Sequence, residues 1–214
     1  MMRTIDKQTW NRREHYEFFK TFNHPHFNMC ANMDLTKTYT YIREKDLSFT
    51  AVIIYLISRT ANEITEFRLR IRGEDVVEHE TVSPSATILV DNDLFGFCSI
   101  DYCQDFAEFS RRTAAQIKAA KEHLSLSDPP GRDDLLFMTA IPWVSFTSFT
   151  HPMRQHPADS IPRFAWGKYF EESGKLKMPL SVQGHHALMD GIHLSRFYEH
   201  IQNYLLHPEE VLAD

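Results

Sequence analysis

The sequence predicts a single-domain α+β fold, a sandwich in which helices cover one face of a mixed β-sheet. Strand-like segments cluster in the middle of the chain, and helical segments are scattered among them. The chain has 214 residues, of which 43% are hydrophobic, so it is long enough to bury one core but short for two domains. We therefore expect residues 1–214 to form one domain.

Four helices are predicted from apolar residues that recur at helical spacing. They cover residues 7–20, 49–64 and 104–124, and a segment that opens after 190–191 and carries its apolar stripe to 205. In the second helix, Val52, Leu56 and Ile64 belong to the periodic apolar set. The last helix is predicted to bury Leu194 and Ile201 in the same way.

Eight strand-like segments lie between these helices and are separated by turn residues. They are residues 68–71, 76–81, 87–90, 94–99, 135–141, 144–149, 163–171 and 175–183. Gly73, Asn92 and Pro142 mark turns within this region. Ser173 and Gly174 are a hairpin signal between the last two segments.

The charge balance argues against a nucleic-acid partner. The chain has 23 Lys and Arg against 29 Asp and Glu, a formal net charge of −6, whereas phosphate-binding proteins are usually basic. The first residues lack the apolar core of a secretory signal, and the longest apolar run, 51–57, is too short to span a membrane.

Cys30, Cys98 and Cys103 have no metal-binding spacing and are expected to be reduced. We expect a cytoplasmic protein with no membrane partner.

The segment 183–193 carries the clearest chemical signal. His185 and His186 end a predicted strand, and Asp190 and Gly191 open the helix that follows. Exposed reactive groups are common where a strand leads into a helix. His186 is a candidate general base, because the unperturbed pKa of histidine is about 6.5.

Other interpretations of this segment remain open from the residues alone. Asp190 is a favoured N-cap for the following helix, and Gly191 would permit a backbone angle closed to other residues. A zinc site needs three or four compact ligands, and no CxxC or HExxH motif is present. The candidate ligands are His185, His186, Asp190 and His193. The same residues are also consistent with a polar turn that has no chemical role.

Residues 185–191 (HHALMDG) resemble the HHxxxDG signature of the chloramphenicol acetyltransferases and, more loosely, that of dihydrolipoamide acyltransferase catalytic domains. Further segments resemble the first family in the same order. Residues 10–18 (WNRREHYEF) are similar to its N-terminal helix, 52–57 (VIIYLI) to its early core helix, 140–146 (AIPWVSF) to its strand leading to the active site, and 179–183 (PLSVQ) to the strand feeding the histidine pair. The resemblance extends from about residue 8 to 205.

This resemblance implies a two-layer α/β sandwich and a homotrimer with active sites at the subunit interfaces. It also implies acetyl-CoA as co-substrate, no metal, and a small-molecule hydroxyl acceptor. The implied reaction transfers the acetyl group directly, without an acyl-enzyme, to the primary hydroxyl of chloramphenicol, and so inactivates the antibiotic.

The resemblance gives His186 the role of general base, which removes the proton of the attacking hydroxyl. In the family, a serine just before the Ala-x-Pro-Trp strand donates a hydrogen bond to the oxyanion. The matching residue here is Thr139, whose hydroxyl can also donate but whose extra methyl crowds the site. A threonine that serves only strand packing is the alternative at this position.

Two further sets of residues are carried over from the family. Asp190 is expected to pair with Arg12 of the N-terminal helix and, with Gly191, to organise the histidine loop. The alternative for Arg12 is an exposed surface position, because a second arginine, Arg13, follows it directly. Coenzyme A is expected to contact Trp143, Lys168 and Tyr169, with Lys168 on a phosphate and Tyr169 on the adenine. A solvated lysine is the alternative for Lys168.

An aromatic pocket is expected for the acceptor. Its matching positions are Phe18, Phe19, Phe95, Phe97, Leu126, Phe137 and Phe149, any of which could equally be plain core. Three residues depart from the family. Phe97 is large where a small residue is usual, Arg163 replaces a β-branched apolar residue, and Ala165 replaces a threonine. Arg163 would bring charge into the pocket, or point outward if the strand register shifts by one residue.

These departures leave several functions open. Chloramphenicol acetylation is the leading hypothesis, and acylation of another small hydroxyl compound is the second. A dihydrolipoamide acyltransferase would usually carry lipoyl modules and linkers, which this chain does not contain. A non-enzymatic ligand-binding module on the same fold is the remaining alternative.

Overall fold

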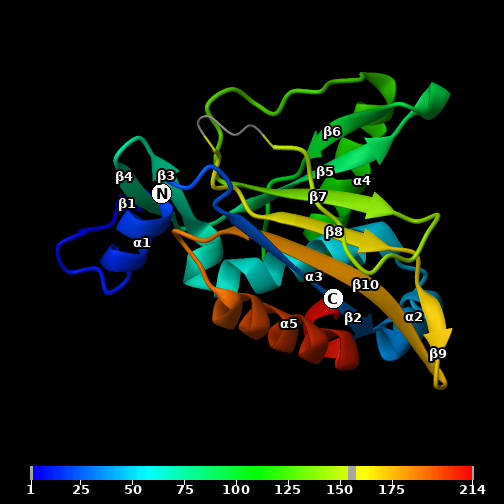
Figure 1. The fold of residues 1–214 in the computed structure, drawn as a ribbon. Helices are drawn as coiled ribbons and strands as arrows, with labels where there is room; N and C mark the ends of the chain where they lie inside the picture. The colour runs from blue at the N-terminus through cyan, green and yellow to red at the C-terminus, as the bar shows by residue number, and fades with distance from the viewer. Residues whose placement is uncertain (1, 154–157, 214) are drawn as a thin grey trace.

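In the computed structural model, which describes residues 2–153 and 158–213, a mixed seven-stranded β-sheet forms the centre of the fold (Figure 1). Its strands are β2 (His26–Asp34), β5 (Ser83–Leu89), β6 (Phe95–Ser99), β7 (Leu135–Ile141), β8 (Arg163–Gly167), β9 (Phe170–Glu172) and β10 (Lys175–His185). The spatial order is β2-β10-β8-β7-β5-β6, and β9 pairs with β10. β7 runs parallel to β5 and β8, whereas the other pairs are antiparallel. The predicted α+β fold with a mixed sheet is therefore confirmed.

Helices cover one face of this sheet (Figure 1). They are α2 (Thr36–Glu44), α3 (Phe49–Glu63), α4 (Phe106–Glu122), α5 (Gly191–Leu206) and the short α6 (Glu209–Leu212). α3 lies at the centre of the layer, because it contacts α2, α4 and α5 as well as β5. Its first turn is capped by Ser48, whose side chain accepts a hydrogen bond from the Ala51 N–H at 3.3 Å. Among the described residues, no helix combines the length and apolarity that a membrane span requires.

The face of the sheet away from these helices carries a separate set of side chains. Side chains alternate across a strand, so on β7 Leu136 and Met138 pack in the helix-covered core while Phe137 and Thr139 lie on the other face. The segment 142–153 crosses this second face. It is bonded to β10 there, since the Ser181 hydroxyl donates to the Phe149 carbonyl at 3.2 Å.

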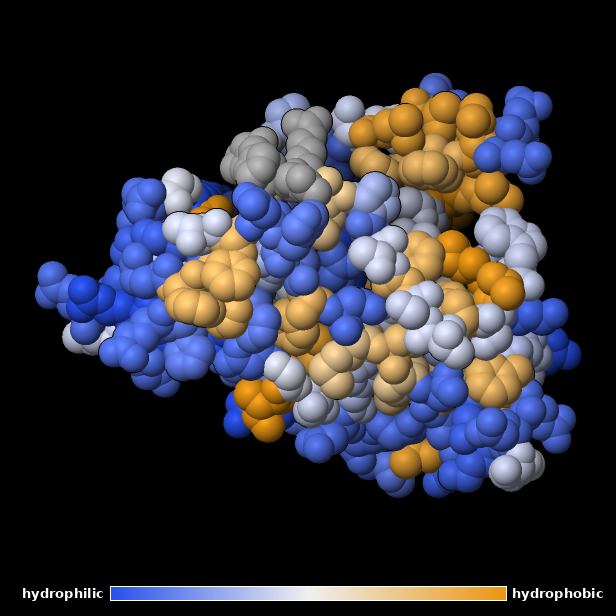
Figure 2. All heavy atoms as spheres, in the orientation of Figure 1, coloured by the Kyte–Doolittle hydropathy of each residue, from blue (hydrophilic) through white to orange (hydrophobic). Residues whose placement is uncertain are grey.

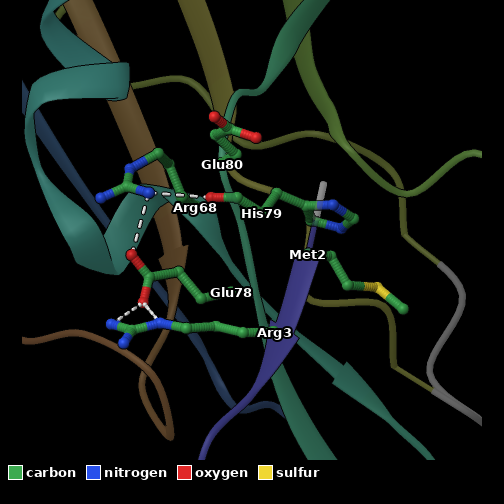
Figure 3. A pocket seen from close by; sticks show the side chains of 6 residues that line it. All are labelled: Met2, Arg3, Arg68, Glu78, His79 and Glu80. Atoms are coloured by element: carbon green, nitrogen blue, oxygen red, sulfur yellow. Dashed lines mark hydrogen bonds and ion pairs between the residues drawn. The ribbon is translucent and has the colours of Figure 1, made fainter.

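A smaller sheet, of order β1-β4-β3, positions the N-terminal helix α1 (Arg13–Phe19). Its strands are β1 (Met2–Thr4), β3 (Leu69–Arg72) and β4 (Asp75–His79). A short 3-10 helix, η1 (Thr65–Arg68), precedes β3, and a second, η2 (Asp91–Asp93), lies between β5 and β6 of the large sheet. Figure 3 shows Arg3 and Arg68 converging on Glu78 beside a cavity of about 300 Å³. The nearly buried Glu78 carboxylate lies 2.6 Å from Arg3 Nη2 and 2.9 Å from Arg68 Nη1. These bonds tie the first strand to the rest of the molecule.

Most predicted elements are present. The helices predicted over 49–64, over 104–124 and after 190–191 correspond to α3, α4 and α5, and the hairpin at Ser173 and Gly174 joins β9 to β10. The first helix is shorter than predicted, because residues 7–12 form turns before it. The strand predicted over 163–171 is interrupted at residues 168–169.

Three assignments need correction. The segment 144–149 was predicted to be a strand and is irregular, because it lies across a face of the sheet and its backbone meets side chains there rather than a strand edge. β2 and α2 were not predicted. β2 contains no β-branched residue, and α2 is rich in Thr and Tyr, which are weak helix formers. β2 is instead held by pairing along its whole length with β10.

Candidate active site

The loop that carries His186 begins where β10 ends, and its main chain is held without help from the His186 side chain. A Cβ atom on Gly184 would lie 2.2 Å from Met189 Sδ, so any larger residue would displace the buried Met189 side chain from its place against the strand. The His186 N–H donates to the Pro25 carbonyl at 2.7 Å. The Met189 N–H donates to the His185 carbonyl at 3.1 Å.

Arg12 holds the same loop from the side of the N-terminal helix. Its Nε donates to the Ala187 carbonyl at 3.1 Å and its Nη2 to the His186 carbonyl at 2.6 Å. Both terminal nitrogens also bind the Asp190 carboxylate, with 2.6 Å between Nη2 and Oδ1. The hydrogen bond from Arg12 holds the pKa of Asp190 below its ordinary value. The expected Arg12–Asp190 ion pair is thus present, and Arg12 is buried rather than on the surface.

The His186 ring is partly exposed and fixed by aromatic contacts. Its side chain is 34% exposed, and it stacks on Phe19 with 4.0 Å between ring centroids and 7° between planes. The Phe27 ring lies 4.6 Å away. Nδ1 is 3.0 Å from Asp190 Oδ1, an ion-pair distance without the alignment of a hydrogen bond. The carboxylate favours a proton on Nδ1, which leaves the lone pair of Nε2 to act as a base.

The adjacent His185 ring points away from the His186 ring and into the protein. His185 is buried, accepts a hydrogen bond from the Ala187 N–H at 3.2 Å and contacts the His26 ring. Burial lowers the pKa of His185 to about 3, so this imidazole is neutral at physiological pH. In the described part of the chain, no three His, Cys, Asp or Glu side chains are grouped so as to hold a metal ion.

A largely apolar groove of about 570 Å³ lies on the face of the sheet away from the helices. Aromatic side chains dominate its lining: Phe95, Phe97, Phe137, Trp143 and Phe149. Thr139 is one of the few polar residues in this groove, and its hydroxyl accepts a hydrogen bond from Thr87 at 3.4 Å. Since Thr87 supplies that proton, the hydrogen of the Thr139 hydroxyl is available to a bound molecule.

Arg163 also lines the groove, so the predicted register is correct and the side chain does not point outward to solvent. Its guanidinium binds Asp159 through two bonds, of 2.6 and 2.9 Å, and lies 5.3 Å from the centre of the Phe137 ring. The charge brought into the groove is therefore paired. Ala165 is fully buried between Thr139 and Ser181 in the sheet register.

The three residues expected to contact coenzyme A follow the C-terminal ends of two neighbouring strands of the sheet. β7 and β8 are parallel, so Trp143 after β7 and Lys168 and Tyr169 after β8 follow strands that end side by side. The Lys168 N–H donates to the Val144 carbonyl at 3.0 Å, which joins the two loops. Trp143 is 65% exposed and Lys168 is also exposed, whereas the Tyr169 hydroxyl lies 3.3 Å from that of Tyr39.

Comparison with known proteins identifies the family. The family model for chloramphenicol acetyltransferase matches residues 1–202. A chloramphenicol acetyltransferase from Bacillus pumilus is 31% identical over 217 residues, covering 100% of this chain and 98% of the relative. Chloramphenicol acetyltransferase 2 from Haemophilus influenzae is 32% identical, covering 92% and 94%. The chain belongs to the chloramphenicol acetyltransferase family. As a member of this family, it is an acyltransferase.

Solved structures agree with this assignment. A chloramphenicol acetyltransferase structure is 29% identical, with a TM-score of 0.87, and covers 96% of this chain and 100% of its own. A dihydrolipoamide acetyltransferase from Azotobacter vinelandii is 16% identical, with a TM-score of 0.69, covering 88% and 84%. The second likeness concerns the fold alone.

Not all residues carried over from the chloramphenicol acetyltransferase family lie where expected in a single chain. Phe18 is 62% exposed and packs beside Phe19 and Phe22, and Leu126 is 60% exposed. Neither Phe18 nor Leu126 is among the described residues that line the groove. Phe19 does not line the groove either and stacks on His186. The expectation for the backbone of Gly191 is wrong. Gly191 has no positive φ, and a Cβ there would meet no other atom within 4 Å.

Some residues of the site were missed from the sequence. Pro25 and Phe27 contact the His186 loop, but they belong to β2 and the turn before it, which the sequence did not predict. Thr87 was assigned to a strand, and only the parallel pairing of β5 with β7 brings it beside Thr139. No local pattern marks either contact, because each depends on how distant strands pair.

Proposed function

We propose that this chain transfers an acetyl group from acetyl-CoA to the primary hydroxyl of chloramphenicol. The observation that carries the proposal is the His186 loop, in which a partly exposed imidazole lies beside Asp190 and the Arg12 guanidinium binds both the His186 carbonyl and the Asp190 carboxylate. Such fixing of a loop around one exposed base is what general-base catalysis requires. The groove bearing Thr139 supplies an apolar surface that suits a nitrophenyl ring.

The reaction is direct transfer. His186 Nε2 takes the proton of the acceptor hydroxyl as its oxygen attacks the thioester carbonyl carbon. The Thr139 hydroxyl donates a hydrogen bond to the oxyanion of the tetrahedral intermediate. The intermediate then expels the sulfur of coenzyme A, which receives the proton held by the imidazolium, and the acetyl ester is released.

One chain does not bring the base and the oxyanion donor together. Thr139 is in register with Ala165, which is in register with Ser181, and His185 lies farther along the same strand. With ~4.8 Å between strands and ~3.3 Å per residue, the Cα atoms of Thr139 and His185 are roughly 16 Å apart. The Thr139 side chain stands perpendicular to the sheet, and none of the described groove-lining residues comes from 184–191.

We therefore infer that the site is completed by a second copy of the chain, within the homotrimer that the family resemblance implies. Hydrophobic side chains gather over the ends of β5 and β6 on the molecular surface (Figure 2). Leu89, Leu94 and Phe95 are each about half exposed there. Exposed apolar patches of this kind support contact with another subunit.

Coenzyme A is assigned to the edge where β7 and β8 end. Lys168 is exposed and supplies a positive charge for a phosphate, and Trp143 supplies an apolar wall that continues into the groove. This placement lets the acetyl end of the cofactor reach Thr139 from the loop after β7, while the acceptor occupies the aromatic part of the groove.

A different hydroxyl compound is the second candidate acceptor, and two observations favour it. Phe97 lines the groove and takes up space there, and Arg163 with its partner Asp159 places a paired charge at the end next to Phe137. An acceptor with a hydrogen-bonding group would suit that end better than a purely apolar one.

An acceptor panel tests the choice between the two. The acetylated product is quantified by chromatography. This avoids thiol-reactive dyes, which would also react with accessible free cysteines of the protein. Chloramphenicol, its 3-deoxy analogue without the primary hydroxyl, and a series of other small primary alcohols are compared. We expect turnover with chloramphenicol and none with the deoxy analogue. Turnover with another alcohol alone would move the assignment to the second candidate.

A further inference from the structure

His193, on the first turn of α5, faces back toward the catalytic loop. Its Nδ1 accepts a hydrogen bond from the Asp190 main-chain N–H at 2.8 Å. On the other side of the ring, Nε2 lies 3.3 Å from Glu66 Oε1, on η1. The side chain is only 12% exposed, so both contacts are shielded from water.

These contacts define which ring nitrogen carries the proton. Because Nδ1 accepts a hydrogen bond, the proton of the neutral imidazole must be on Nε2, the nitrogen that lies 3.3 Å from Glu66 Oε1. Burial lowers the pKa of His193, an effect to which Arg12 and Arg196 add and which Glu66 and Asp190 oppose. The neutral ring is therefore the form that holds Asp190 near pH 7.

The bond to Asp190 is one step from the proposed base. The Asp190 carboxylate faces His186 Nδ1 at 3.0 Å and binds Arg12, and Arg12 in turn binds the His186 carbonyl. The direction of the carboxylate depends on the Asp190 backbone, and the N–H of that backbone is fixed by His193. A chain of contacts thus runs from Glu66 on η1 through His193 on α5 to the loop of His186.

We propose that His193 is a positioning residue for acetyl transfer, which holds the Asp190 backbone so that the carboxylate orients the His186 ring. The role rests on the proposed function, since it acts through the proposed base. It differs from simple capping of α5, because a cap alone would stabilise the helix without affecting His186.

Leucine and asparagine at position 193 separate the bond to Asp190 from the space that the ring fills. The Asn amide oxygen can replace Nδ1 and keep the bond to the Asp190 N–H. Leucine fills similar space but has no hydrogen-bond acceptor, so it loses the bond to Asp190. We expect His193→Leu to lower kcat about five- to tenfold with an unchanged KM for acetyl-CoA, and His193→Asn to stay within about twofold of wild type.

Three further readouts complete the test. In a His186→Ala background, His193→Leu should add nothing to the loss of rate, because both changes act on the same base. In NMR spectra, the His186 ring protons, shifted by the stacked Phe19 ring, should move in His193→Leu and stay in place in His193→Asn. Thermal melting of both variants measures the effect on folding.

The inference is overturned if His193→Asn and His193→Leu have equal kcat, or if the His186 ring signals are the same in both. Those signals do not require turnover. If the wild type acetylates no acceptor while the signals move as expected, the proposed function fails and the positioning of His186 by His193 stands as a structural fact.

Discussion

Replacing His186 with alanine is expected to lower kcat for acetyl transfer by about 10²–10⁴-fold, because it removes the base that takes the proton of the acceptor hydroxyl. Affinity for acetyl-CoA should be unchanged. The loop should keep its shape, since the bonds from Arg12 and to Pro25 involve the main chain of His186 and not its ring. Glutamine at this position, which fills similar space but is not a base, should give the same loss.

Steady-state rates with chloramphenicol and calorimetric titration of acetyl-CoA measure the two quantities. His200→Ala is a matched control, because His200 is a half-exposed histidine on α5 outside the catalytic loop. Its activity should equal that of wild type. Substantial turnover in both His186→Ala and His186→Gln would show that another residue is the base.

Replacing Thr139 with alanine is expected to lower kcat about 10²-fold through loss of the donor to the oxyanion. Valine keeps the shape of threonine without the hydroxyl, so Thr139→Val should show the same loss. Serine keeps the hydroxyl and removes the methyl that crowds the groove, so Thr139→Ser should retain or exceed wild-type activity. The KM for acetyl-CoA should change little in all three variants, because the donor is needed mainly in the transition state.

Comparison of kcat for alanine, valine and serine at position 139 separates the contribution of the hydroxyl group from the contribution of side-chain packing. Loss of activity in Thr139→Ser would contradict the donor role and would instead make the methyl group essential. Activity in Thr139→Val would assign Thr139 to strand packing, with the oxyanion bound by some other group.

Elements with a strong local pattern were predictable from the sequence. α3 was identified because its apolar residues recur at helical spacing, and the Ser173–Gly174 hairpin because its turn residues are distinctive. β2 was not, because it lacks β-branched residues and is stabilised by its long pairing with β10. Tertiary pairing overrides weak local propensity in such a strand.

The site was predictable in part and for a different reason. The Arg12–Asp190 pair joins residues 178 positions apart, and only the family resemblance indicated it. The groove residues were predicted with mixed success, since Phe97 and Phe149 line the groove whereas Phe18 and Leu126 are exposed in a single chain. His193 was weighed only as a metal ligand, because its bond to the Asp190 N–H depends on the backbone of the helix start. Sequence patterns do not specify such a contact.

The central claim is that His186 of one chain and Thr139 of another act in one site, and mixing two inactive variants tests it most directly. His186→Ala and Thr139→Ala chains, carrying different tags, are unfolded together, refolded at equal amounts and purified through both tags. A site that takes its histidine from the Thr139→Ala chain and its groove from the His186→Ala chain is intact. Purification through both tags leaves trimers that contain both variants, and in each of these one of the three sites is intact, so we expect activity to return to about a third of wild type. Doubly tagged oligomers no more active than the two variants alone would contradict the shared site.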